Sequence, residues 1–185
     1  MRSAVRAVKY MKRSRKMLNN WNAPYLQLLV KQIETQSKQT LARWAADYAE
    51  RVLLPLWSKH YPDDSRPRNA LAAANKWLTG EIKLPEAKAA ILECHAAARE
   101  AETNPAAQAA ARAIGQSAST IHAAGHCIGL ALYGALAIAF DSLGTTAPWE
   151  QTEKRAAEEC GRMLEALRAI SVDNEPNPAK ISWKC

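Results

Sequence analysis

Three histidines are the residues whose type and surroundings are best suited to chemistry. His122 and His126 are four residues apart, which on a helix places both imidazoles on one side, and His95 follows Ile91 by four, so it too should face a core. Two imidazoles at this spacing can share a metal ion, but a metal site needs three or four converging ligands. We favour a buried polar network of His95, Arg99, His122 and His126. A metal site or an enzyme built on the three histidines is the alternative.

Opposite charges gather between residues 63 and 68, at the expected start of a helix. Arg66 and Arg68 follow Asp63 and Asp64, and two cations at a helix N-terminus oppose its dipole. We favour pairing of the arginines with these or other acids, and the alternative is that they stay available for an acidic partner or a phosphate. For contact with a partner protein we predict these four residues together with Trp149, which stands at a helix edge.

The signatures of several enzyme classes are missing from the sequence. It has no glycine-rich phosphate loop, no G-x-S-x-G motif and no convincing Ser/His/Asp order. The four cysteines, at positions 94, 127, 160 and 185, show no C-x-x-C pair or zinc-ligand pattern. Three of them fall in helical, alanine-rich surroundings, where a free cysteine behaves as a small hydrophobic residue, and this is typical of a reducing cytoplasm. We therefore expect a binding protein that requires no cofactor, and regard an enzyme as the weaker hypothesis.

The elements that position these residues are expected to be helices. Alanine supplies 37 of 185 residues and glycine seven, a composition that favours helix and excludes an all-β sandwich, a collagen-like fibre or a disulfide scaffold. No stretch alternates at period two, so we predict a compact all-α bundle of about six helices. They are expected at residues 24–38, 40–54, 66–79, 85–102, 105–143 and 148–170.

Local signals set several of these boundaries. Ser37 and Ser65 are suited to cap helices, and Gly80 should stop the one that Ser65 begins. Pro55 should kink or end its helix near Leu54, because proline removes a backbone donor.

The region 105–143 is predicted to be the central, apolar helix. Small residues recur at steps of three and four from Ala107 to Ala139, and no charged residue lies between Ile114 and Phe140. Residues 121–140 are long enough to cross a membrane, but the polar residues around the histidines favour a core helix, so we predict no membrane span. The small-residue seam could be buried within one chain or in a homodimer.

The positive charge is concentrated at one end of the sequence. The net charge is +7, and residues 1–16 hold seven cations and no acid, whereas 18 basic and 18 acidic residues follow from Met17 onward. We predict a basic arm over 1–20, one helical domain over 21–172 and an irregular tail over 173–185. The arm either contacts phosphates or anionic lipid, which leaves a nucleic-acid-binding protein as another alternative, or is a dispensable extension before Met17.

Five motifs occur in an order that resembles a known family. They are W-A-A-D-Y-A-E-R-V-L (44–53), D-x-R-P-R-N-A (64–70), A-N-K-W-L-T-G-E-I (74–82), E-C-H-A-A-A-R-E-A (93–101) and S-T-I-H-A-A-G-H-C-I-G-L-A-L-Y (119–133). Over roughly residues 41–140 the chain resembles a bacterial family of all-helical immunity proteins. The resemblance implies a cytoplasmic protein that protects its producer by binding a polymorphic toxin. The matching pattern residues are Asp64, Arg66, Pro67, Arg68, Trp77, Gly80, His95, Arg99, His122 and His126.

Overall fold

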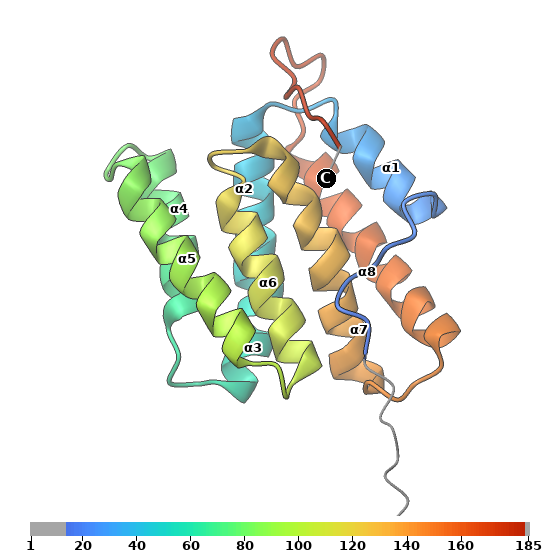
Figure 1. The fold of residues 1–185 in the computed structure, drawn as a ribbon. Coiled ribbons are helices and arrows are strands. Elements are labelled where there is room, and N and C mark those ends of the chain that lie inside the picture. Colours follow the sequence, from blue (N-terminus) through green and yellow to red (C-terminus); the bar gives the residue numbers. More distant parts are fainter. Residues whose placement is uncertain (1–13, 184–185) are drawn as a thin grey trace, which may run out of the picture.

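The fold is built from helices alone in the part of the chain that the computed structural model describes, residues 14–183 (Figure 1). The elements are α1 (Pro24–Ile33), α2 (Lys38–Tyr48), the π-helical turn η1 (Ala49–Leu53), α3 (Leu54–His60), α4 (Arg66–Leu78), α5 (Leu84–Glu100), α6 (Pro105–Ser119), the 3-10 turn η2 (Ala124–Cys127), the π-helical turn η3 (Leu130–Ala135), α7 (Leu136–Leu143) and α8 (Trp149–Ile170). Because α2, η1 and α3 run on as one rod, and η2, η3 and α7 as another, the described chain forms seven rods. The predicted all-α fold is confirmed, with seven rods in place of six.

α6 is the central helix of the bundle. Eleven of its fifteen residues are buried, and it packs against α2 to α5 and against α7 (Figure 1). Most of the buried positions are alanines, whose small side chains let the neighbouring helices approach closely. The prediction of a central helix rich in small residues is therefore confirmed for residues 105–119.

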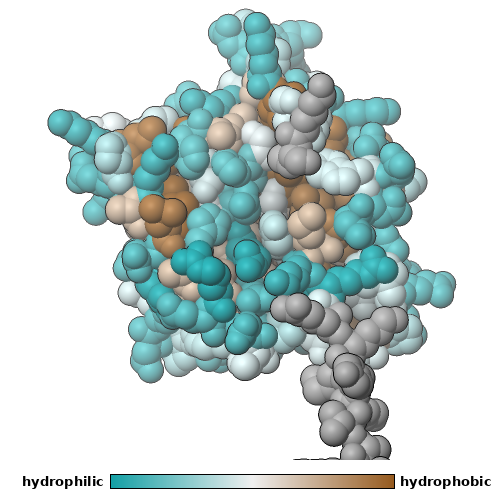
Figure 2. All heavy atoms as spheres, viewed as in Figure 1, coloured by the Kyte–Doolittle hydropathy of each residue, from teal (hydrophilic) through white to brown (hydrophobic). Residues whose placement is uncertain are grey.

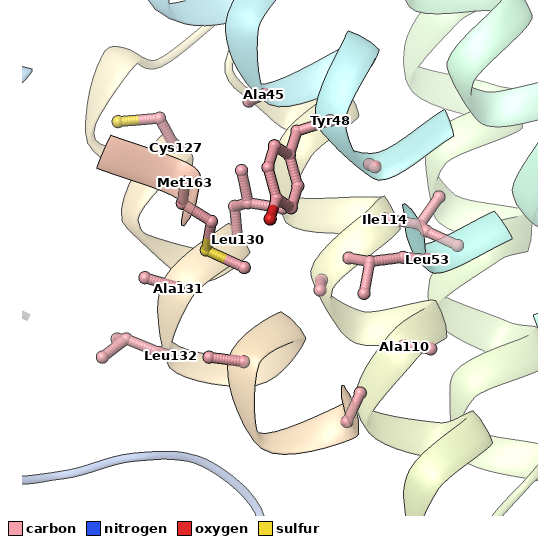
Figure 3. Close-up of a cluster of buried hydrophobic side chains, with 14 of the residues drawn as sticks. Ala45, Tyr48, Leu53, Ala110, Ile114, Cys127, Leu130, Ala131, Leu132 and Met163 are labelled. Carbon is pink, nitrogen blue, oxygen red and sulfur yellow. The ribbon is translucent and has the colours of Figure 1, made fainter. Parts of the chain in front are cut away.

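Larger side chains from the surrounding rods fill the core. Figure 3 shows Ile114 of α6 beside Leu53 of η1, while Tyr48 and Leu130 gather with Met163 of α8. Leu53, Ile114, Leu130 and Met163 are completely buried, and removing apolar side chains of this size from water is the main stabilising term in a fold of this kind.

The prediction of one continuous helix from residue 105 to residue 143 is wrong. α6 ends at Ser119, where the hydroxyl group donates to the Gly115 carbonyl at 2.8 Å, and the Thr120 hydroxyl donates to the Gln116 carbonyl at 3.2 Å. Ala123 is extended, at φ −143° and ψ 110°, and the chain then returns alongside α6 through η2, η3 and α7. A heptad-like pattern fits both arms of this hairpin, so periodicity did not reveal the break.

The predictions of helix boundaries were partly right. Ser37 caps α2 by accepting from the Thr40 amide at 3.3 Å, but the side chain of Ser65 makes no cap hydrogen bond. The Asp64 carboxylate accepts the Arg66 amide instead, at 3.1 Å. Pro55 does not end its helix, because the π-helical turn η1 comes just before it and the rod continues as α3.

The apolar stretch Ala124–Leu143 has the length and composition of a membrane-crossing helix, but 67% of its most apolar window is buried inside the structure. It serves as a core element against α6 and α8. The small-residue seam, which could have packed against a second copy, is likewise buried within the single chain: Ala107, Ala111, Ala118, Ala135 and Ala139 are all at 0% exposure.

Two irregular segments lie against the bundle. Leu18 is buried, and its amide donates to the Leu132 carbonyl at 2.9 Å. The segment after α8 is tied to the α1–α2 connection, where the Gln36 carbonyl accepts the Ala179 amide at 2.8 Å. The Trp183 ring lies 6.1 Å from that of Trp21, centroid to centroid, so the two segments also meet each other.

Candidate functional site

The charged loop before α4 is organised by internal ion pairs. Arg66 NH2 lies 2.7 Å from Asp64 Oδ2 and 2.6 Å from Glu100 Oε2, which ties the start of α4 to the end of α5. The hydrogen bonds from Arg66 lower the pKa of Asp64 and that of Glu100. The favoured interpretation of pairing therefore holds for Arg66.

The two outer residues of this loop differ from the inner pair. Asp63 and Arg68 are exposed, and neither forms an ion pair with any residue in the range 14–183. Of the four charged residues predicted here to touch a partner, these two can do so without breaking an existing contact.

Trp149 does not present a bare aromatic edge. It begins α8 and is half-buried, and the guanidinium carbon of Arg15 lies 3.9 Å from the centroid of its ring. A cation at this distance is attracted by the electron-rich face of the indole. The predicted contact residue is therefore paired with a cation from the segment before α1.

The three histidines lie in one region, and two of them meet, though not by the predicted geometry. His122 lies in the turn after α6 and His126 in η2, so the helix break separates them, and the expected i, i+4 face does not exist. Their rings still meet edge to face, with centroids 5.3 Å apart. His126 Nδ1 lies 2.7 Å from the Gln116 side-chain oxygen. We refer to His95, His122 and His126 as the histidine cluster.

His95 reaches the cluster from α5 across a gap that glycine provides. A Cβ at Gly115 would lie 2.6 Å from His95 Cε1, so the half-buried ring rests directly on the α6 backbone. Burial lowers the pKa of His95, and the nearby charges of Arg112, His126 and Arg99 lower it further. The ring is therefore held in its neutral form.

The other two rings are also held neutral. Burial lowers the pKa of His122 and of His126, and the nearby charges of His126, Lys88 and Lys38 lower that of His122 further. His122 Nδ1 is buried without a hydrogen-bond partner among the described residues. Within residues 14–183 no three His, Cys, Asp or Glu side chains are placed to hold a metal ion.

Arg99 does not belong to a buried network, which corrects the prediction for this residue. Its side chain is exposed on the last turn of α5 and lines a cavity of about 470 Å³. We call this cavity the basic pocket. It is lined by Ser14, Arg15, Lys16, Arg99, Glu102, Pro105, Gln108, Ala109 and Arg112.

The basic pocket combines three parts of the chain that the sequence pattern treated separately. Arg15 and Lys16 come from the segment before α1, Arg99 from α5 and Arg112 from α6. Figure 2 shows strongly hydrophilic side chains gathered across the lower part of the face on which the lower ends of α5 and α6 lie. The positive charge is therefore not confined to the terminal arm.

One buried carboxylate was not among the predicted site residues. Glu159 of α8 is only 3% exposed and accepts from the Tyr48 hydroxyl at 2.7 Å, from Arg155 at 3.1 Å and from Arg162 at 2.9 Å. Burial raises the pKa of Glu159, but these hydrogen bonds outweigh it and hold the pKa below its usual value. The sequence did contain a signal for this contact. Arg155 precedes Glu159 by four residues and Arg162 follows it by three, so on a helix all three lie on one face.

The three cysteines within residues 14–183 carry no reactive site. Cys94, Cys127 and Cys160 are unpaired and buried. Burial raises the pKa of the Cys94 and Cys160 thiols to about 12 and raises that of Cys127 as well, so none of the three is poised as a thiolate.

Comparison with known proteins extends the resemblance noted in the sequence. The model of a family described as Imm-5 like putative immunity protein matches residues 31–166, from the end of α1 through most of α8. The match therefore reaches beyond residues 41–140 at both ends. No curated protein and no solved structure gives a match. The chain belongs to the Imm-5 like putative immunity protein family.

Proposed function

We propose that this protein binds a toxin in the bacterial cytoplasm and neutralises it by protein–protein contact. The observation that supports this is membership of the immunity family, which implies a protein partner and a non-enzymatic role. Contact alone is sufficient for such a role, and no cofactor is required. Three buried, unpaired cysteines fit a reducing compartment.

We place the contact surface at the lower end of the bundle in Figure 1, where the α3–α4 loop, the α5–α6 turn and the α7–α8 loop lie. This end carries Asp63 and Arg68, both exposed, and Leu143, which is 40% exposed. It also carries the stacked pair of Arg15 and Trp149. Arginine and tryptophan beside an exposed apolar side chain is the composition that dominates binding energy in protein interfaces.

The test is an affinity capture in which the full chain is the bait, followed by a growth assay. A stoichiometric partner should be recovered from the source cells, should inhibit growth when expressed alone, and should lose that effect when the bait is co-expressed. A partner without toxicity, or toxicity that the bait does not relieve, would contradict the proposal.

Single charge reversals locate the contact surface. Arg68→Glu should weaken capture, because the side chain is exposed and makes no ion pair within the described residues. Arg43→Glu is the matched control, since Arg43 is exposed on α2. Arg66→Glu is unsuitable, because it would set a third carboxylate against Asp64 and Glu100 and disturb the loop itself. Equal capture by the Arg68 and Arg43 variants would move the surface away from this loop.

A further inference from the structure

The basic pocket carries an excess of positive charge that no other described residue neutralises. Four cations and one carboxylate, that of Glu102, leave a net charge of +3. None of the four cations pairs with a carboxylate among residues 14–183, and residues 1–13 contain no Asp or Glu. Like charges held this close repel one another, so an anion that bound there would be attracted by all four.

Two of the pocket's side chains are already held in place. Arg15 is fixed by its stacking on Trp149 and by a hydrogen bond of 3.1 Å from its NH1 to the Asn19 side-chain oxygen. Gln108 donates to the Ala98 carbonyl at 2.9 Å, which joins the two helices that form the pocket wall. A site whose donors are positioned before the ligand arrives loses less conformational entropy on binding.

Arg112 supplies an unsatisfied donor. Its Nε atom is buried and has no hydrogen-bond partner among the described residues. A buried donor on a charged group costs free energy until an acceptor reaches it. Arg112 lines a cavity of about 470 Å³, which is large enough to admit a small ligand, and a turn of its side chain would bring Nε to an acceptor there.

We propose that the basic pocket binds a small ligand with two or three linked phosphoryl groups, a function that goes beyond toxin binding and does not depend on it. Such a group concentrates about three negative charges in a small volume, which matches a net charge of +3 within one cavity. Its tetrahedral arrays of oxygens also suit the planar donor forks of arginine. An acidic peptide carries one charge on each flexible side chain, and a nucleic-acid strand carries one on each nucleotide, so both spread the same charge over a longer span.

The direct test is calorimetric titration of the full chain at constant ionic strength. The probes are pyrophosphate, ATP, inorganic phosphate, a hexa-aspartate peptide and a short thymidine oligonucleotide. Pyrophosphate or ATP should bind with one site per chain and more tightly than inorganic phosphate. Tighter binding of the peptide, tighter binding of the oligonucleotide, or no binding of pyrophosphate and ATP would each overturn the proposal.

Variants separate binding from folding. Arg99→Gln should weaken pyrophosphate binding about tenfold or more, because an exposed cation and its charged hydrogen bond are lost. Glu102→Gln should strengthen binding several-fold by removing the pocket's carboxylate, an outcome that a damaged fold would not give. Arg43→Gln, on α2, is the control and should leave affinity unchanged. Unchanged affinity in both pocket variants would place the bound anion elsewhere.

A second readout places the bound anion. Arg112 and Arg99 both lower the pKa of His95, so an anion beside them should raise the midpoint at which the His95 ring titrates in NMR spectra. Saturating pyrophosphate that leaves this midpoint unmoved would show that the anion does not occupy the basic pocket.

Discussion

Replacing Gly129 by alanine tests the closest approach between α6 and the returning arm of the hairpin. The Gly129 backbone is helical, at φ −59° and ψ −26°, so alanine meets no conformational penalty there. A Cβ at this position would lie 2.6 Å from Gln116 Cγ and closer still to Gln116 Cβ, which is fixed to the α6 backbone. Gln116 also holds His126, so relieving the overlap would disturb that hydrogen bond.

The expected change in the free energy of unfolding for Gly129→Ala follows from two opposing effects. Alanine is favoured over glycine in a helix by about 1 kcal/mol, whereas forcing an extra methyl group into a packed site costs about 1–3 kcal/mol, and an overlap this close should exceed the gain. Gly161→Ala in α8 is the matched control, because nothing lies within 4 Å of its Cβ position. Urea denaturation followed by circular dichroism should show a lower free energy of unfolding for Gly129→Ala and a higher one for Gly161→Ala. Equal stabilisation by both substitutions would refute the close approach.

Three further predictions concern the buried polar groups. In a double-mutant cycle of Tyr48→Phe and Glu159→Gln, urea denaturation should give a coupling energy of about 1–3 kcal/mol, since the hydroxyl–carboxylate bond is buried; additive effects would contradict it. The histidine cluster has pKa values lowered by burial, so the unfolded chain binds more protons below about pH 6.5 and the free energy of unfolding should fall from there towards pH 5; a constant value over that range would contradict burial of the rings. In a Cys185→Ser variant the three buried cysteines should react with a thiol reagent only after denaturant is added, and fast labelling of the native protein would disprove their burial.

The all-α fold and its central helix were predictable because their causes are local and repeated. Alanine content, proline and glycine at helix boundaries, and steps of three and four residues act over a few turns, and each recurs many times. The helix break at residues 120–123 was not predictable in the same way. It coincides with the hydroxyls of Ser119 and Thr120 bonding back to their own helix, a contact that favours a bend, and it leaves the hydrophobic period intact on both sides.

In the candidate site, too, local features were predictable from the sequence and features that depend on distant contacts were not. Pairing of Arg66 with Asp64 could be expected, because they are two positions apart in sequence and the helix dipole makes an isolated cation unfavourable. The basic pocket could not, since its cations come from positions 15, 16, 99 and 112 and meet only after three segments have packed. In the sequence analysis Arg15 and Lys16 were counted with the basic arm. Arg99 and Arg112 were counted in the remainder of the chain, where acidic and basic residues are equal in number.

One stripe of α6 connects the basic pocket to the histidine cluster. Gln108 and Arg112 line the pocket. One turn further along the helix, the His95 ring packs on Gly115, and the Gln116 side chain is hydrogen-bonded to His126. These positions are spaced by three and four, so they share one side of a helix whose remaining sides are largely buried alanine. Because Arg112 lowers the pKa of His95, the charge state of the pocket and the protonation of the cluster are linked. An anion in the pocket would therefore favour protonation of His95, and protonation of His95 would strengthen anion binding by the same factor.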